Sequence, residues 1–272
     1  MANENYLIAL DLDGTLLRDD KTISPLSKLV LNKAMELGHE VMIATGRPYR
    51  SSEIYYKELG LTTPIVNFNG AFVHHPHDSS WGIFHEPMEL ETAKEIIEAC
   101  QHFTFYNIIA EVIDDVYFHY HDERLVDIFS MGDPKIQTGD LRKVLSDHPT
   151  SLLIHAAEEH VQNIRNHLDD VHAEVIDHRR WAAPWHVIEI VKSGLNKAVG
   201  IEKVAKHFQI PPSRIIAFGD EDNDLEMITY AGTGVAMGNA INPLKDIANE
   251  VAKTNEEDGI AHFLMEHLSI HV

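Results

Sequence analysis

The sequence predicts an α/β protein whose doubly wound parallel sheet is interrupted by an inserted α+β domain. Three observations carry this prediction. Short, continuously apolar runs alternate with amphipathic helical patterns at both ends of the chain, as they do in parallel βαβ units. The middle of the chain loses this rhythm and shows helical patterns among several short strand patterns. The length of 272 residues gives room for two domains.

The first part of the chain follows the order strand, helix, strand, helix, strand. Three short apolar runs are expected as buried strands, at residues 6–10, 41–44 and 64–68. Ser24 and Pro25 provide an N-cap and a first turn for a helix that ends at Gly38. A second helix is expected near residues 52–59. Consecutive units of this kind form a right-handed parallel sheet.

The regular order stops at residues 71–87, where a turn-rich stretch predicts a hairpin. Beyond it, helices are expected at residues 89–100, near Leu125 and around 161–168. Short strands are expected among them at residues 107–111, 116–119, 151–155, 173–176 and 186–191. The predicted domains are residues 1–83 for the first part of the core, 84–188 for the insertion and 189–272 for the second part of the core.

The α/β rhythm returns near the end of the chain. A helix is expected at residues 196–208 and a strand at 215–218. A strand at 234–237 follows, then a helix that starts at Asn242 and Pro243 and carries Leu244, Ile247 and Val251. A helix at 260–268 closes the chain.

The charge of the chain limits its partners. Asp and Glu number 43 against 22 Lys and Arg, which gives a net charge of −21. Such a chain repels nucleic acid and anionic lipid, so neither is expected as a partner. Binding of a phosphorylated anion would need local cations or backbone N–H groups. We expect a monomer or a homodimer.

The sequence indicates no internal disulfide and no histidine metal site, and its first residues do not resemble a signal peptide. The single cysteine, Cys100, excludes an internal disulfide and is expected to be a buried helix residue. The 19 histidines are expected at ordinary solvated positions, because metal sites need converging ligands. The first residues show neither a basic start nor a long apolar run, so we expect a cytoplasmic protein.

Two aspartates follow the first predicted strand. Residues two apart in an extended chain point the same way, so Asp11 and Asp13 both project from the carboxyl edge of the sheet, where α/β proteins bind ligands. One carboxylate there can attack phosphorus, and the other can act as general acid and base. The alternative is a surface acidic turn with a flexible Gly14.

Two further segments could bind an anion. Thr45, Gly46 and Arg47 follow the second predicted strand, where a hydroxyl and backbone N–H groups at a helix start favour negative charge. Lys197 lies in the first turn of the helix capped by Asn196. Alone, the first segment fits an N-cap threonine with a glycine turn, and the second fits a solvated lysine.

The strongest chemical signal is the segment 219–224, which follows the strand at 215–218 and places four carboxylates within five positions. Such crowded charges repel unless a cation binds them, and their oxygens suit Mg²⁺. An EF-hand loop is excluded, because a helix begins directly after the cluster. An acidic helix start is the remaining alternative.

Taken in order, these segments resemble the four motifs of the haloacid dehalogenase-like phosphatases. They are Asp11-Leu12-Asp13-Gly14-Thr15-Leu16, Thr45-Gly46-Arg47, Lys197, and 219–227. The likeness is to the Cof-type hydrolases, which have a Rossmann-like core and a large inserted α+β cap, and Asn69-Gly70 also fits this subfamily. Ala198 departs from the glycine that the family often has there, without loss of a functional group.

The resemblance implies a role for each matching residue. Asp11 would be the nucleophile and a metal ligand, and Asp13 the acid/base, with its backbone carbonyl on the metal. Asp220 would complete the Mg²⁺ site and Asp224 would support it. The phosphoryl group would be held by Thr45, the Gly46 and Leu12 backbones, Lys197 and Asn223, with Arg47 and Asn69 as further substrate contacts.

The implied activity is Mg²⁺-dependent hydrolysis of small phosphorylated metabolites, such as sugar, nucleotide or cofactor phosphates, through an aspartyl-phosphate. Asp13 favours phosphate esters over haloacids, which need no protonation of a leaving group. A sugar phosphomutase and a non-catalytic phosphate-binding protein are the alternatives. The binding protein would have lost a catalytic carboxylate, and none is lost.

Substrate choice is expected to lie in the cap. Basic and aromatic residues gather just before the chain returns to the core: Arg179, Arg180, Trp181, Trp185 and His186. Such side chains can bind a sugar or a heteroaromatic phosphate. The alternative is a buried tryptophan pair that packs the cap sheet.

Overall fold

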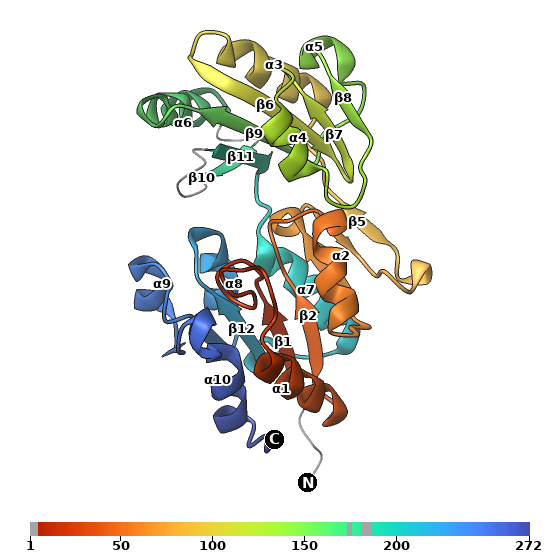
Figure 1. Ribbon diagram of the computed structural model, residues 1–272, viewed down its shortest axis with the longest axis vertical. Helices are drawn as coiled ribbons and strands as arrows, with labels where there is room; N and C mark the ends of the chain where they lie inside the picture. Colours follow the sequence, from red (N-terminus) through yellow and green to blue (C-terminus); the bar gives the residue numbers. More distant parts are fainter. Residues whose placement is uncertain (1–4, 173–175, 181–186) are drawn as a thin grey trace. The chain divides into compact units, whose positions relative to one another are not determined.

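The computed structural model describes residues 5–172, 176–180 and 187–272, with the backbone alone at 172 and 176–180. The chain forms two compact units (Figure 1). The first comprises Met1–Arg47, Ser52–Ile83 and Asn196–Val272, and the second Pro48–Ser51 and Phe84–Leu195. No helix in the described part of the chain is long and apolar enough to cross a membrane.

The first unit is built on a parallel sheet of five strands in the order β14-β13-β12-β1-β2. Their bounds are β1 (Leu7–Leu10), β2 (Glu40–Ile43), β12 (Ile215–Gly219), β13 (Thr233–Ala236) and β14 (Glu250–Val251). The central strands β1 and β12 are buried along their whole length, because helices cover both faces. This confirms the predicted fold class.

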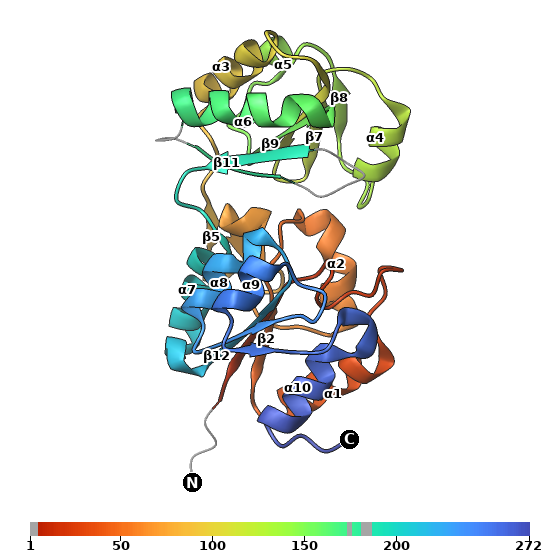
Figure 2. The same cartoon turned by 90° about the vertical axis from the view of Figure 1, so that its left-hand side faces the viewer.

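Helices cover the two faces of this sheet in two groups (Figure 2). One face carries α1 (Pro25–Glu36) and α10 (Gly259–His267), and the other carries α7 (Lys197–Phe208), α8 (Leu225–Tyr230) and α9 (Asn242–Ile247). Ser24 accepts a hydrogen bond from Ser27 N at 3.0 Å, as expected of the N-cap of α1. Helix α2 (Tyr49–Glu58) begins directly after Pro48, earlier than predicted.

Two predictions for the first unit need correction. The third strand, β3 (Ile65–Asn67), meets the parallel sheet only through a bridge between Ala44 and Val66. It pairs antiparallel with β4 (Phe72–His74), which neighbours β5 (Ile83–His85). Val251 lies in β14 beside β13, so helix α9 ends before it.

Short 3-10 helices fill the connections: η1 (Phe68–Gly70), η2 (Ser79–Trp81), η3 (Pro212–Arg214), η4 (Asp222–Asp224) and η5 (Asn255–Glu257).

The second unit has a six-stranded sheet in the order β10-β11-β9-β6-β7-β8. The strands are β6 (Phe105–Val112), β7 (Asp115–Phe118), β8 (Ile136–Thr138), β9 (Ser151–Ala156), β10 (Ile176–Arg180) and β11 (Val187–Lys192). Neighbours are antiparallel except β7 and β8, which are parallel. Since β11 continues to Lys192, the second unit extends past residue 188.

The two faces of this sheet are covered differently (Figure 2). Helices α3 (Leu90–Cys100), α5 (Leu141–Val144) and α6 (Glu158–His172) bury one face in a large apolar core. Helix α4 (Glu123–Phe129) packs on the other face over Ile109 and Phe118. Strand β8 and helix α5, the shortest strand and the shortest helix described in this unit, were not predicted from the sequence.

Candidate active site

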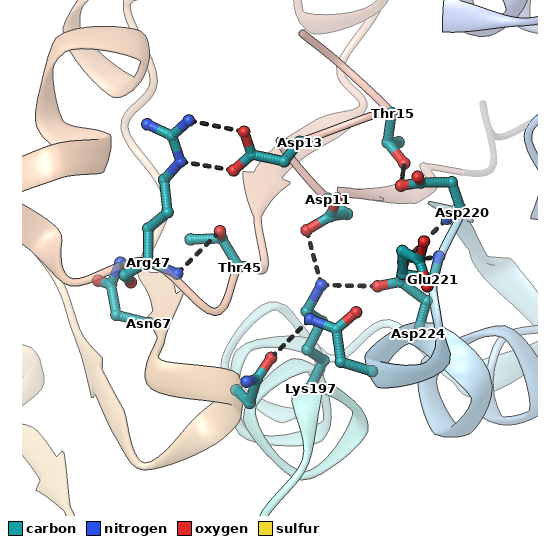
Figure 3. Close-up of polar contacts among 12 residues, drawn as sticks. Asp11, Asp13, Thr15, Thr45, Arg47, Asn67, Lys197, Asp220, Glu221 and Asp224 are labelled. Atoms are coloured by element: carbon teal, nitrogen blue, oxygen red, sulfur yellow. Dashed lines mark hydrogen bonds and ion pairs between the residues drawn. The ribbon is translucent and has the colours of Figure 1, made fainter. Parts of the chain in front are cut away.

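The carboxyl ends of neighbouring strands bring the sequence motifs together. Asp11 follows β1, and Asp220 follows β12, which pairs with β1. Thr45 follows β2 on the other side of β1. These residues come from positions far apart in the sequence, yet they lie at one edge of the sheet (Figure 3).

Lys197 joins this edge from the first turn of α7. Asn196 caps the helix by accepting a hydrogen bond from Val199 N at 3.1 Å. The wholly buried Lys197 Nζ donates to Oδ1 of Asp11 and to Oδ1 of Asp224, both at 2.6 Å (Figure 3). Burial alone would lower the pKa of Lys197, but the two carboxylate charges outweigh it and raise this pKa. The lysine is therefore a fixed cation at the site.

The acidic segment after β12 is oriented by hydrogen bonds. Thr15 Oγ1 donates to Asp220 Oδ1 at 2.8 Å. The backbone N–H groups of Asp220 and Glu221 donate to Asp224 Oδ2 at 2.9 and 3.1 Å. Gly14 passes so close that a Cβ there would lie 2.2 Å from Asp220 Oδ2. The carboxylates are thus held in place before any ligand binds.

The charges of this cluster do not balance. Burial first, and then neighbouring carboxylates, raise the pKa of Asp11 to about 7 despite Lys197. The same two causes raise the pKa of Asp220 to about 8. Three largely buried carboxylates therefore share one ammonium, which favours binding of a further cation.

The donor set fits a hard divalent ion. One oxygen from each of Asp11, Asp220 and Asp224 can be chosen so that all three lie within 4.8 Å of one another. In the described part of the chain, no other set of acidic, histidine or cysteine side chains meets this condition. Carboxylate oxygens suit Mg²⁺, which binds few protein ligands and keeps waters or substrate oxygens.

Asp13 faces a different group of residues. Arg47 donates to both of its oxygens, from Nε at 2.6 Å and from a terminal nitrogen at 2.7 Å (Figure 3). Lys21 Nζ adds a contact at 2.8 Å. Burial alone would raise the pKa of Asp13, but the hydrogen bonds and charges of Arg47 and Lys21 lower it to about 2. In this arrangement Asp13 is a carboxylate at neutral pH.

The remaining phosphate-binding candidates surround Gly46. Thr45, almost fully buried, accepts a hydrogen bond from Arg47 N at 3.1 Å. Asn223 Nδ2 donates to Asn69 Oδ1 at 3.0 Å. Asn69 has a left-handed backbone with φ of 51°, and its amide lies 3.2 Å from where a Cβ of Gly46 would be. Glycine at 46 thus lets the amide of Asn69 approach the backbone.

Of the other predicted site residues, Leu12 is fully described, whereas the candidates in the second unit are described only in part or not at all. Leu12 is fully buried between the two aspartates. Arg179 pairs with Glu189 through the register of β10 and β11, but its side chain, like that of Arg180, is not described. Trp181, Trp185 and His186 lie outside the described residues.

Two site neighbours escaped the sequence analysis. Lys21 contacts Asp13 from the loop after it, where no local pattern marks a lysine as functional. The Tyr55 ring lies 5.4 Å from the Arg47 guanidinium, as in a cation–π contact. The position of Tyr55 in the sequence of α2 fits an amphipathic helix and does not by itself indicate a functional residue.

Comparison with known proteins gives one family. The model of the haloacid dehalogenase-like hydrolase family matches residues 8–264. The 5-amino-6-(5-phospho-D-ribitylamino)uracil phosphatase YitU of Bacillus subtilis is 60% identical over 270 residues, which cover 99% of this chain and 100% of that protein. Pyridoxal phosphate phosphatase YbhA of Escherichia coli is 30% identical and covers 96% of this chain and 98% of its own.

A solved structure agrees with these relatives. A haloacid dehalogenase-like hydrolase from Bacteroides thetaiotaomicron has a TM-score of 0.82 and 26% identity, with 97% of this chain and 99% of that chain covered. The family match spans most of the chain and includes all four motifs. The protein belongs to the haloacid dehalogenase-like hydrolases of the Cof type and is a phosphatase.

Proposed function

We propose that this phosphatase hydrolyses a small phosphorylated metabolite with the help of Mg²⁺ and through a phosphoryl group carried by Asp11. The observation that carries the proposal is the charge of the buried cluster. Asp11, Asp220 and Asp224 share the single ammonium of Lys197. A divalent cation would balance the three carboxylates and the ammonium, and would thereby let an anionic phosphoryl group approach.

Asp11, Asp220, Asp224 and the backbone carbonyl of Asp13 would hold Mg²⁺. When bound, the ion neutralises the charge that builds up as an anionic nucleophile approaches an anionic phosphate. Lys197 supplies a second positive charge beside Asp11. Thr45, Asn223 and the backbone N–H groups of Leu12 and Gly46 would hold the phosphoryl oxygens.

The reaction then has two steps. A carboxylate oxygen of Asp11 attacks phosphorus, and the bond to the ester oxygen breaks while Asp13 gives that oxygen a proton. In the second step Asp13 takes a proton from water as the water oxygen attacks phosphorus. The bond between phosphorus and Asp11 breaks, and inorganic phosphate and the Asp11 carboxylate are released.

The acid role of Asp13 requires its pair with Arg47 to open. Both oxygens of Asp13 are engaged by Arg47, so Asp13 does not carry the proton in the arrangement seen. A substrate phosphate dianion offers Arg47 another anion of suitable geometry. We infer that substrate binding draws Arg47 away and leaves Asp13 able to hold a proton.

The substrate that we propose is 5-amino-6-(5-phospho-D-ribitylamino)uracil. The support is the identity of 60%, over nearly the whole of both chains, with a phosphatase named for this compound. The relative named for pyridoxal phosphate is only 30% identical. We also propose that the second unit is the cap that selects the substrate, because the family motifs all lie in the first unit.

The test is phosphate release from a panel of substrates. It contains the ribityl-aminouracil phosphate, pyridoxal phosphate, a hexose phosphate and an aryl phosphate, each with Mg²⁺ and with excess chelator. We expect chelator-sensitive release, the highest kcat/KM for the first compound, and none from Asp11→Asn. Transfer of the phosphoryl group within the sugar would instead support a mutase. No turnover of any member by the folded enzyme would contradict the proposal.

A further inference from the structure

The loop that follows Asp13 determines the surroundings of this residue. Leu17 forms isolated bridges to Asp13 on one side and to Ile23 on the other. Lys21, in a left-handed backbone conformation with φ of 64°, returns from the tip of the loop to Asp13. A shift of residues 14–23 would therefore move Lys21 and the Leu17 bridge, two of the contacts that orient Asp13.

Two asparagines from the end of the chain hold this loop. Asn255 Nδ2 donates to the backbone oxygen of Leu17 at 3.0 Å and to Asp19 Oδ1 at 3.3 Å. Asn239 Nδ2 donates to the backbone oxygen of Gly14 at 2.8 Å. The two are linked, since Asn255 N donates to Asn239 Oδ1 at 3.1 Å.

The partners fix the orientation of the Asn239 amide. Its nitrogen faces a carbonyl, which only accepts, and its oxygen faces a backbone N–H, which only donates. Asn255 has 9% of its surface exposed, so its bonds compete little with water. A flipped or absent side chain would leave the Gly14 or Leu17 carbonyl without this donor.

Two further side-chain contacts join the same segments. Glu256 accepts a hydrogen bond from Asp19 N at 2.7 Å, in an exposed position. Arg18 pairs with Asp258 at 3.1 Å, with both side chains partly exposed. The bond of Asn239 to Gly14 is exposed as well, whereas that of Asn255 to Leu17 is buried. The two asparagines therefore add restraints from outside the loop to those of its own backbone, in which Leu17 N donates to Leu12 O at 2.8 Å.

We propose that Asn239 and Asn255 are positioning residues for Asp13. Their hydrogen bonds described above go to the loop and to each other, and not to Lys197 or to the cluster of Asp11, Asp220 and Asp224. We expect their loss to weaken proton transfer by Asp13 more than attack by Asp11, because their bonds end on the loop that carries Lys21 and not on Asp11. This inference rests on the proposed function, in which Asp13 protonates the leaving group.

The test compares two substrates that differ in their need for an acid. An alkyl phosphate has a poor leaving group and needs Asp13, whereas an aryl phosphate needs it less. Asn239 is exposed, so Asn239→Ala is expected to fold. We expect the ratio of kcat for the alkyl to kcat for the aryl phosphate to fall about tenfold, in the direction of Asp13→Ala, with little change in KM.

A matched control is Asn249→Ala. Asn249 is also exposed, and its Oδ1 accepts a hydrogen bond from Gly234 N at 2.7 Å, which joins the residue before β14 to β13. This variant should keep the wild-type ratio. Amide hydrogen exchange in residues 14–23 gives a second readout, which should be faster in Asn239→Ala and in Asn255→Ala and unchanged in the control.

Two results would overturn the positioning role. One is an equal loss on both substrates, which indicates general destabilisation. The other is an unchanged ratio together with unchanged exchange in the loop. A wild-type enzyme that hydrolyses both substrates would leave the proposed function intact in either case. Wild-type enzyme that hydrolyses neither would overturn the proposed function and this role with it.

Discussion

The ammonium of Lys197 lies 2.6 Å from Oδ1 of Asp11, and the lysine side chain has no exposed surface. These residues are 186 positions apart in the sequence. A buried charge without its partner is costly, so each residue is held in place by the other. The pair gives the Asp11 carboxylate one fixed direction and keeps a positive charge beside the proposed nucleophile.

Replacement of Lys197 by methionine should therefore remove both activity and stability. The variant leaves Asp11 and Asp224 buried without a counter-charge, which costs about 3–5 kcal/mol when a buried pair is broken. Chemical denaturation and phosphate release would measure the two effects. Lys206→Met is the control on the same helix, because its pair with Glu202 is exposed and such pairs contribute about 0.5 kcal/mol.

The metal-free protein should lose stability as the pH rises. The pKa of Asp11 and of Asp220 is about 7 and about 8 in the folded chain, above the ordinary value of 3.8. The contribution of these two groups to the free energy of unfolding is fully present when the pH is below their ordinary pKa. This contribution is lost as the pH rises through their pKa values in the folded chain. In chelator, the melting temperature of the wild type should therefore fall relative to Asp220→Asn as the pH is raised.

Added Mg²⁺ should reverse the difference in melting temperature between the wild type and Asp220→Asn. The ion needs ionised carboxylates, so its stabilising effect on the wild type should grow as the pH rises. Asp220→Asn lacks one ligand and should gain little. If Mg²⁺ raised both melting temperatures equally at every pH, the three-carboxylate site would be wrong.

Gly14→Ala should weaken metal binding as well as folding. The glycine has φ of 78°, and an added Cβ would lie 2.2 Å from Asp220 Oδ2. Gly60→Ala is the control, because φ is 63° there but nothing lies within 4 Å of the new Cβ. Both should lose about 1 kcal/mol from backbone strain. Only Gly14→Ala should need more Mg²⁺ for half-maximal activity, and equal requirements would argue against contact with the metal site.

Arg47→Ala should raise KM for phosphate esters about tenfold, because a charge-assisted bidentate contact with the phosphate is lost. Lys21→Ala removes the other cation that contacts Asp13. The Lys21 side chain is more exposed than that of Arg47, so this variant should raise KM much less. Steady-state kinetics on one substrate would compare them. Similar KM values for the two variants would mean that Arg47 serves only to hold Asp13.

Much of the core and the site could be predicted because both depend on local patterns and one topological rule. Asp11, Thr45 and Asp220 follow apolar strands, and parallel strands in one sheet end at the same edge. The position of Lys197 followed from an asparagine cap and a helix pattern. None of these inferences needed the conformation of a side chain.

The features that escaped prediction depend on contacts between distant residues. The Arg47 pair with Asp13 rests on side-chain conformations that a motif does not specify. Strand β3 leaves the parallel sheet because Phe68 and Asn69 take left-handed conformations and turn the chain back into β4. Val251 fitted a helical spacing, but its pairing beside β13 places it in a strand.

The roles of Asn239 and Asn255 show the same limit. Each is one asparagine in a connecting segment, and neither belongs to one of the four family motifs. Only the fold brings them against the loop that follows Asp13. Residues that act through a loop are therefore visible in the structure and not in the sequence.

The central claim is that Asp11 carries the phosphoryl group during turnover. The most direct measurement is acid quenching of the enzyme with a ³²P-labelled aryl phosphate and Mg²⁺, followed by peptide mapping. We expect hydroxylamine-labile label on the peptide that contains Asp11, more of it in Asp13→Asn because the water step then lacks its base, and none in Asp11→Asn. Near wild-type turnover by Asp11→Asn, or no label on that peptide in any variant, would contradict the account.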